Sequence, residues 1–314
     1  MHKNFFSDNS FCDPGTPTTL VFAYSNDFAA DLVNIFFNFF INNDASPHYV
    51  MFGSIRFDVR NKGDFVFDKN INDVNASIMA HQPDPSLGFG NRNTGSDVLD
   101  MIDRYLDVKN VPICGSNLII FVKRYPNETD ITQFVTKLRQ YHATFTIFAS
   151  YESSGGSNPE TLISLASKVN GFCVFDNDSN IISELIYIPT VYNPYLFYTA
   201  NPQCSDDQVL ALPVMNLPGY GDFWVEVTIQ DSGPMSVVNA ALYQWGSNQI
   251  GLLNRQPAGY ENLSGNHEGT WKSMKDAAYN VSLTCKYDDA KSRILQMRVY
   301  SDIHVPDDWM PYDD

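Results

Sequence analysis

The chain has few basic residues for its length. Its 314 residues include 20 Lys and Arg against 36 Asp and Glu, which gives a formal net charge of −16 at pH 7. No cluster of Lys or Arg occurs along the sequence. Nucleic acids and anionic membrane surfaces are bound through concentrated positive charge, so neither is expected as a partner. A basic or neutral protein, or a glycan, is the expected kind of ligand.

Long apolar runs are missing as well. A helix that spans a bilayer needs about 20 consecutive apolar residues. The longest run here, residues 33–41, is interrupted by Asn34 and Asn38. No membrane span is therefore expected. Residues 1–6 (MHKNFF) also lack the apolar core of a secretory signal peptide, so no secretion signal is visible.

Cysteine is scarce, and none of the cysteines forms a C-x-x-C pair. A zinc site is therefore not expected. The chain contains several Asn-x-Ser/Thr sequons, which permit N-glycosylation of a secreted protein without proving it. The cysteines are Cys12, Cys114, Cys173, Cys204 and Cys285, and the sequons begin at Asn75, Asn127, Asn177, Asn262 and Asn280.

Motifs for catalysis are also missing. The six histidines are scattered, and no G-x-S-x-G elbow, Walker loop or dinucleotide fingerprint is present. Residues 153–157 (SSGGS) lack the Lys and the spacing of a phosphate-binding loop, so we interpret them as a flexible loop. No enzyme activity and no cofactor are expected. A hydrolase that joins a His to a carboxylate in a cleft stays open as an alternative.

Residues 17–188 alternate between strand-like and helix-like segments. Residues 18–25 (TTLVFAYS) are a continuous apolar run, typical of a strand buried on both faces. The turn Asn61-Lys62-Gly63 predicts an antiparallel hairpin. The alternation predicts a doubly wound, mostly parallel α/β sheet of six strands, covered by helices on both faces. Strands are predicted at 18–25, 49–59, 64–67, 117–122, 143–149 and 171–175, and helices at 28–40, 70–80, 94–107, 129–141 and 159–169.

After about residue 190 helical periodicity disappears, and short strand-like runs are separated by Gly, Pro, Asn and Asp. This texture predicts a second domain, an all-β sandwich. The strands are predicted at 208–212, 223–229, 236–243, 250–253, 279–285 and 294–300. The predicted organisation is an N-terminal tail (1–16), the α/β domain (17–188), a proline-containing linker (189–203), the sandwich (204–303) and an acidic tail (304–314), which we expect to be a disordered, solvated end.

The order of strands and helices in residues 17–188 resembles the von Willebrand factor A (VWFA) family. Residues 20–25 resemble its first strand, and residues 90–95 (GNRNTG) resemble its Gly-Gly-Thr-x-Thr-Gly loop. Residues 118–123 resemble the strand that ends in Thr-Asp-Gly, and residues 143–175 its closing strand-helix-strand. The whole chain resembles secreted VWFA proteins of the nematode type.

The family usually holds a divalent cation at the carboxyl edge of the sheet, through an Asp-x-Ser-x-Ser motif, a Thr and an Asp. Aligning these motifs places Tyr24, Arg92 and Lys123 at ligand positions, and Arg124 follows. Magnesium requires oxygen ligands. An ammonium about 5 Å from a divalent ion costs roughly 6–7 kcal/mol at an effective dielectric constant near 20. The resemblance therefore implies a degenerate metal-ion-dependent adhesion site that binds no metal.

Two interpretations of that edge stay open. Lys123, Arg124 or Arg92 receives an acidic side chain of a partner directly. Alternatively, they are solvated loop residues or neutralise Asp27 and Asp58 of a relic site. The candidate ligand-binding residues are thus Ser25, Asn26, Asp27, Arg92, Lys123 and Arg124, of which the first three have capping of the first helix as their ordinary alternative role.

The resemblance also implies a disulfide. The family's first and fourth strands are neighbours, and Cys12 and Cys114 each precede one of them, so we predict Cys12–Cys114. Cys204 and Cys285 both lie in the second domain and are expected to pair there, in a loop closure that stabilises by about 4 kcal/mol in the chain-entropy model. Cys173 lies inside an apolar strand and is predicted to be a free, buried thiol.

These observations predict a non-catalytic, extracellular protein-interaction or adhesion module that works without metal through the carboxyl edge of its first sheet. The alternative is a glycan-binding protein that acts through the sandwich, with the α/β domain as a scaffold. A sugar-binding platform would use aromatic side chains, although aromatics in strands more often pack in the core. The aromatic candidates are Trp224, Tyr243, Trp245 and Trp271.

Overall fold

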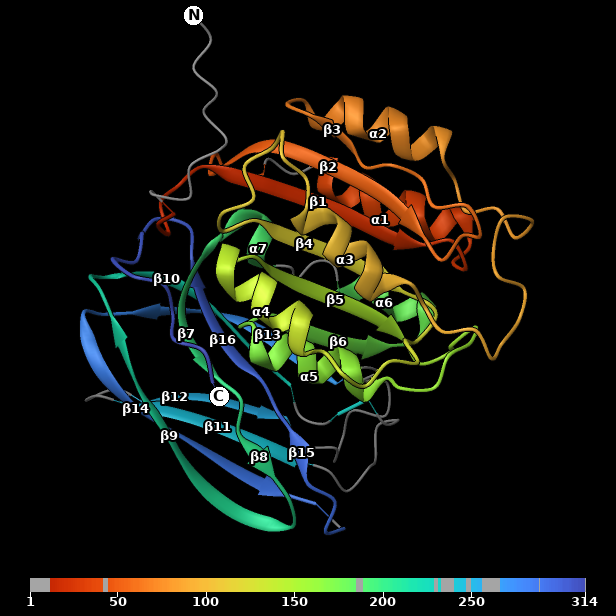
Figure 1. The fold of residues 1–314 in the computed structure, drawn as a ribbon. Coiled ribbons are helices and arrows are strands. Elements are labelled where there is room, and N and C mark those ends of the chain that lie inside the picture. The colour runs from red at the N-terminus through yellow and green to blue at the C-terminus, as the bar shows by residue number, and fades with distance from the viewer. Residues whose placement is uncertain are drawn as a thin grey trace, which may run out of the picture.

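The computed structural model in Figure 1 describes residues 12–41, 45–184, 189–228, 231–232, 240–246, 250–255, 266–287 and 289–313. These residues form an α/β domain and a β-sandwich that lie against each other. Asn262 and most of the predicted N-terminal tail lie outside the described residues.

The α/β domain is built on one six-stranded sheet in the order β3-β2-β1-β4-β5-β6. Strand β3 is antiparallel to β2, and every other neighbouring pair is parallel. This confirms the predicted doubly wound fold and its antiparallel hairpin. Among the described residues, no helix is both long and apolar enough to cross a membrane. The elements are β1 (Thr18–Ser25), α1 (Ala30–Ile41), β2 (Tyr49–Phe57), β3 (Val66–Asp68), α2 (Ile71–Ala80), α3 (Val98–Leu106), β4 (Asn117–Val122), α4 (Thr132–Tyr141), β5 (Thr144–Ser150), α5 (Glu160–Lys168), β6 (Phe172–Asp176), α6 (Asp178–Glu184) and α7 (Pro189–Tyr192).

Helices cover both faces of this sheet, which is why its central strands are apolar throughout. Every residue of β1 is buried. Its alternate side chains separate into two cores: Val21 and Ala23 pack with α3, α4 and α5, whereas Phe22 and Tyr24 pack with α1, α2, α6 and α7. The continuous apolar run that predicted this strand is thus a consequence of burial on both sides.

The second domain is a sandwich of two antiparallel sheets, β13-β10-β16-β7 and β12-β11-β14-β9. Phe223 and Val225 of the first sheet meet Tyr243, Trp245 and Leu283 of the second in one apolar core. The all-β prediction is confirmed. The elements are β7 (Tyr195–Ala200), β8 (Gln203–Cys204), β9 (Asp207–Leu217), β10 (Gly221–Thr228), β11 (Ala240–Gly246), β12 (Ile250–Arg255), β13 (His267–Met274), β14 (Ala277–Lys286), β15 (Arg293–Ile294) and β16 (Met297–Ser301).

The segment that we predicted as a linker, residues 189–203, is part of both domains. Residues 189–192 form α7, and Val191 packs in the core of the α/β domain. Strand β7 pairs with β16 and forms an edge of a sandwich sheet. Pro194 directly precedes this strand, a position that proline tolerates, so the prolines misled the linker prediction. Strand β13 (HEGTWKSM) was missed because only two of its residues are large and apolar.

Both predicted disulfides are present. Cys12 and Cys114 are joined across the neighbouring strands β1 and β4, with their Cα atoms 5.6 Å apart. Cys204 and Cys285 are joined within the sandwich, with a Cα separation of 6.3 Å. Cys173 is a free thiol buried in β6, and its burial raises the pKa well above the usual value.

Strand β6 is the last strand of the α/β sheet, and its outer edge is capped by side chains of the sandwich. The backbone N–H of Phe175 donates to Asn266 Oδ1 at 2.8 Å, and that of Cys173 donates to Gln296 Oε1 at 2.9 Å. The N–H of Asn266 returns a bond to the carbonyl of Phe175 at 3.2 Å. An unpaired strand edge is a template for aggregation, and here it is satisfied within the chain.

Arg298 of β16 fastens the same interface from inside. Its side chain is fully buried and donates across the interface to the carbonyl of Gly171 (2.6 Å), and on the sandwich side to the carbonyl of Ala200 (3.2 Å) and to Asn201 Oδ1 (2.8 Å). Glu226 lies directly opposite on β10. Burial raises the pKa of Glu226 to about 7, against the opposing influence of His267 and Arg298. A guanidinium with this many acceptors joins the two domains into one body.

The acidic tail is not the disordered, solvated end that we predicted. After β16 the chain crosses to the amino edge of the α/β sheet, where the ring of Trp309 stacks on His142 at a centroid distance of 4.6 Å. Its indole N–H donates to the carbonyl of Cys12 at 3.1 Å, and Asn170 donates to the carbonyl of Met310 at 3.1 Å. The aromatic residues of this segment therefore pack against the α/β domain. We predicted that the segment is solvent-exposed because it contains several acidic residues.

We predict that replacing Arg298 by Met weakens the whole chain, because the buried acceptors of the guanidinium lose their donor and Glu226 loses a nearby positive charge. The free energy of unfolding, measured by urea denaturation, should fall by about 3–5 kcal/mol. Lys137→Met, which removes an exposed ion pair with Asp103, should change it little. Wild-type stability in the Arg298→Met variant would contradict this role.

Candidate binding edge at the carboxyl ends of the strands

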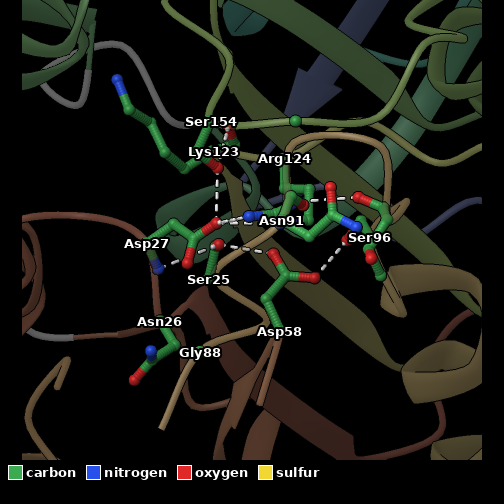
Figure 2. Close-up of polar contacts among 12 residues, drawn as sticks. Ser25, Asn26, Asp27, Asp58, Gly88, Asn91, Ser96, Lys123, Arg124 and Ser154 are labelled. Carbon is green, nitrogen blue, oxygen red and sulfur yellow. Dashed lines mark hydrogen bonds and ion pairs between the residues drawn. The ribbon is translucent and has the colours of Figure 1, made fainter. Parts of the chain in front are cut away.

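The loops that follow β1, β4 and β5 meet at the carboxyl edge of the α/β sheet. Strand β1 lies between β2 and β4, so successive connections leave it in opposite directions. Open α/β sheets place their ligands at such a point. Figure 2 shows the polar side chains that gather here.

The centre of the edge is an ion pair between Asp27 and Arg124. The Arg124 Nε donates to Asp27 Oδ2 at 2.9 Å, and its Nη2 lies 2.8 Å from the same oxygen. Ser154 donates its hydroxyl to this oxygen as well, at 2.5 Å. Arg124 is only 3% exposed. The carboxylate therefore holds a buried guanidinium and a hydroxyl from two different loops (Figure 2).

The same guanidinium also binds the loop that precedes α3. Its Nη1 donates to the carbonyl oxygens of Asn91 and Thr94, both at 2.7 Å. The guanidinium carbon lies 5.6 Å from the ring centre of Phe89. One buried cation therefore connects the β1 loop, the 89–94 loop and the end of β4.

The Gly155-Gly156 pair allows the loop after β5 to approach this cation. A Cβ on Gly155 would lie 2.2 Å from Arg124 Nη1, and one on Gly156 would lie 1.8 Å from the carbonyl oxygen of Tyr125. Gly156 also has a φ of +76°, which favours glycine. Backbone bonds join Gly156 to Arg92 (2.9 Å) and Ser154 to Lys123 (2.8 Å). The predicted flexible loop at 153–157 is instead held against the edge.

Lys123 is paired separately and extends away from the Asp27–Arg124 pair (Figure 2). Its Nζ lies 2.6 Å from Asp178 Oδ2 and 3.1 Å from Ser150 Oγ, and its side chain is 12% exposed. Asp178 stands at the start of α6, just after β6. The charge of Lys123 is thus balanced inside the chain.

Asp58 is a buried carboxyl group without a cation partner among the described residues. Ser25 donates to its Oδ2 at 2.5 Å, and Ser96 donates to its Oδ1 at 2.7 Å. The backbone N–H of Asp97 adds a bond at 3.1 Å. Burial raises the pKa of Asp58 to about 8, although the two serine hydroxyls oppose the shift. Its φ of +61° is a conformation that Asp tolerates better than most residues.

Tyr24 and Asn26, the neighbours of Ser25, face other surroundings. Tyr24 packs in the core on the α1 side and donates its hydroxyl to the carbonyl of His81 at 2.9 Å. The amide of Asn26 donates to the carbonyl of Asp84 at 2.9 Å and accepts from its N–H at 3.0 Å. Asn26 thereby fixes the loop that follows α2.

The residues at this edge do not fit the divalent cation that the fold family usually holds. Tyr24 points into the core, and Arg92 and Lys123 offer no oxygen ligand in their side chains. Oxygens of Asp27, Asn91 and Thr94 are bonded to Arg124, and those of Asp58 accept from Ser25 and Ser96. A metal there would have to displace a buried positive charge.

The structure brings most of the predicted residues together, in roles that differ from some expectations. Arg124 neutralises Asp27, as one interpretation held, but Asp58 binds hydroxyls instead of a cation. The Asp27 carboxylate binds Arg124 and Ser154, and α1 starts only at Ala30, so the helix-cap role predicted for Asp27 is not what the structure shows. Arg92 is exposed.

Sequence reasoning missed Ser96, Ser154 and Asp178. Each carries a hydroxyl or carboxylate that holds one of the predicted residues. Asp178 follows the end of β6 closely, and Ser154 follows β5. Polar residues just after parallel strands were therefore a usable signal, because those strand ends share one edge.

The remaining predicted sites lie on the surface. Asn127, Asn177 and Asn280 are exposed, and Asn75 is partly buried in α2. Their glycosylation stays a prediction. Asn127 also supports the edge, because its amide donates to the carbonyl of Asn93 at 2.9 Å.

Comparisons with known proteins found similarities for both domains. A family model described as a domain of unknown function (DUF7154) matches residues 200–302. A search of curated proteins found no match. Among solved structures, the chain is similar to a von Willebrand factor type A protein from Catenulispora acidiphila, at 10% identity and a TM-score of 0.41, covering 91% of this chain and 62% of that one.

Two further solved structures are similar to single domains. The SpRpn10 VWA domain matches at 16% identity and a TM-score of 0.37, covering 54% of this chain and 94% of that one. The C-terminal CBM6 of the laminarinase LamC from Zobellia galactanivorans matches at 12% identity and a TM-score of 0.22, covering 35% and 96%. These TM-scores lie below 0.5, so the fold assignment rests on strand order: residues 18–176 have a von Willebrand A-like fold, and the C-terminal sheets form a β-sandwich.

We predict that Arg124→Gln lowers the free energy of unfolding by about 3 kcal/mol or more, because Asp27 is left as a buried charge. Urea denaturation measures this loss, and Arg92→Gln, at an exposed neighbour, should have little effect.

The melting temperature of the wild type should be the same in excess Mg²⁺ and in chelator. A rise of several degrees with Mg²⁺ would show that the ion binds the folded chain.

Stability should also decrease as the pH rises toward about 8. The raised pKa of Asp58 means that the folded chain holds a proton that the unfolded chain releases near pH 4, so this stabilisation is complete below about pH 4 and is lost progressively between about pH 4 and about pH 8. The slope for one proton is at most about 1.4 kcal/mol per pH unit.

Asp58→Asn should flatten this part of the profile, since an uncharged amide can accept from one of the two serine hydroxyls through its oxygen and donate to the other through its NH2 group. Asp64→Asn, at an exposed acid, serves as the control. Urea denaturation at pH 5, 6, 7 and 8 makes the comparison. An unchanged slope in Asp58→Asn would assign the pH dependence to other groups.

Proposed function

We propose that this chain is a non-catalytic extracellular binding protein whose α/β domain engages a protein partner through the loops of its carboxyl edge, without a metal. The observation that supports this proposal is the set of bonds from Arg124 to Asp27, Asn91 and Thr94, which we call the Arg124 clamp. Because Arg124 is buried at the end of β4 and bonded to two other loops, the edge is preorganised by a cation that belongs to the chain. Preorganised loops lose less conformational entropy on binding.

The extracellular part of the proposal is supported by the two disulfides. Disulfides persist in oxidising compartments and are rare in the cytosol. One of them closes the α/β domain at its amino edge and the other closes the sandwich. Both domains would then keep their covalent links outside the cell.

The clamp also decides which side chains a partner meets. The donors of Arg124 are used inside the chain, and Lys123 is paired with Asp178. Arg92 stands beside them with an exposed side chain, between exposed Asn91 and Asn93. We therefore assign contact with an acidic group of a partner to Arg92, with Lys123 and Arg124 positioning the loops. This refines the interpretation in which any of the three cations receives the acid.

The test is a pairwise screen of the purified chain against an array of extracellular domains, in chelator. A partner that binds wild type should lose at least tenfold in affinity with Arg92→Glu, because a charge is reversed at the contact. Lys109→Glu makes the same change at an exposed position near the amino ends of the strands and should bind normally. Binding that needs Mg²⁺, or that is equal for wild type and Arg92→Glu, would contradict the proposal.

A second candidate function, binding of a glycan by the sandwich, is favoured by one side chain. Trp271 is 50% exposed on β13, the edge strand of its sheet. Its three companions in the predicted aromatic set are core residues: Trp224, Tyr243 and Trp245 are at most 4% exposed. Of the four predicted aromatic residues, only Trp271 is therefore exposed enough to contact a glycan.

A further inference from the structure

We infer that Trp271, Asp222 and Ser273 form a shelf that binds a neutral saccharide; this rests on the second candidate function and names its site. The three residues lie on two paired strands. Trp271 is directly opposite Trp224, and Ser273 is directly opposite Asp222. Residues two apart on a strand point to the same face, so all these side chains share one face. The intervening Phe223 points into the sandwich core.

Trp271 is held in place from behind. The ring of Trp224 contacts it edge to face, with centroids 5.4 Å apart and planes inclined by 74°. Trp224 lies against Gly269, where a Cβ would come within 2.2 Å of the indole. The absence of a side chain at Gly269 therefore makes room for the supporting ring. An indole fixed in this way loses little freedom on binding, which lowers the cost of recognition.

The polar part of the shelf is next to the ring. Ser273 donates its hydroxyl to Asp222 Oδ1, and both residues are exposed. The second carboxylate oxygen is an acceptor that sugar hydroxyls can reach. A sugar ring presents C–H groups on its face and hydroxyls at its rim, which match an aromatic face beside a carboxylate.

The charges favour a neutral saccharide over an anionic one. Asp222 would repel a carboxylated or sulfated ligand, and the chain as a whole carries −16. Both the local charge of Asp222 and the net charge of the chain therefore favour a neutral ligand.

The experiment uses the full chain, because the sandwich is fastened to the α/β domain by Arg298 and by the caps on β6. Affinity electrophoresis is run through gels that contain mannan, a β-1,3-glucan, hydroxyethyl cellulose or, as the anionic comparison, polygalacturonate. We expect retardation by at least one neutral polysaccharide and not by polygalacturonate. Trp271→Ala should lower the affinity for that polysaccharide tenfold or more. Asp222→Asn should lower the affinity less, and Trp271→Phe should retain most of the affinity.

The outcomes separate this site from the function on which it rests. Val209→Ala, at a residue 70% exposed on the other sheet, is the control and should bind as wild type. Binding to a neutral polysaccharide that Trp271→Ala leaves unchanged overturns the shelf and keeps glycan binding. Binding to none of the neutral polysaccharides overturns both. Retardation by polygalacturonate alone overturns the neutral class of ligand.

Discussion

The capping of strand β6 is the constraint on which the arrangement of the two domains depends. An edge strand must have its backbone groups satisfied, and here the side chains of Asn266 and Gln296 do this in place of a further strand. The sandwich sheet that supplies Gln296 consequently has one apolar face against the second sheet and one polar face, which is buried at Glu226 and Arg298 and exposed near Trp271 and Asp222. Arg298 and Glu226 are tolerated in that second layer because their charges and hydrogen bonds are largely matched there.

The carboxyl edge shows a different solution to the same problem of organising loops. A divalent cation would gather oxygen atoms from several loops but would have to be loaded from solution. The guanidinium of Arg124 gathers a carboxylate and two carbonyl oxygens, and it is attached to the chain. It directs its donors along fixed lines, so it holds the loops in one arrangement but keeps little capacity for a ligand. A partner of the edge would then be contacted by the exposed side chains beside Arg124, such as Arg92.

Sequence patterns predicted the α/β domain well because its central strands are buried on both faces and are apolar throughout, as in β1 and β4. They predicted the sandwich less completely. In β10 apolar and polar residues alternate, which predicts a strand but not what its polar face meets, and Glu226 and Arg298 are in fact buried. A similar limit applied to the edge. The family resemblance located the candidate positions and left neutralisation of Asp27 as one of two interpretations, but the pairing of Arg124 with Asp27 and of Lys123 with Asp178 needed three-dimensional distances. Pairing across loops leaves no spacing signal.

Joining the domains through buried polar contacts has a consequence for binding. The carboxyl edge belongs to one domain and the Trp271 shelf to the other, and the bond from Arg298 to Gly171 and the caps on β6 link the two domains. If each surface binds a ligand, a single glycosylated partner can use both surfaces at once. It gains affinity from both only when its protein and sugar groups match the distance between the carboxyl edge and the Trp271 shelf. A rigid pair of weak sites favours partners with the correct geometry, because no linker adjusts to the others. Selectivity would then arise from the interface between the domains as much as from either surface.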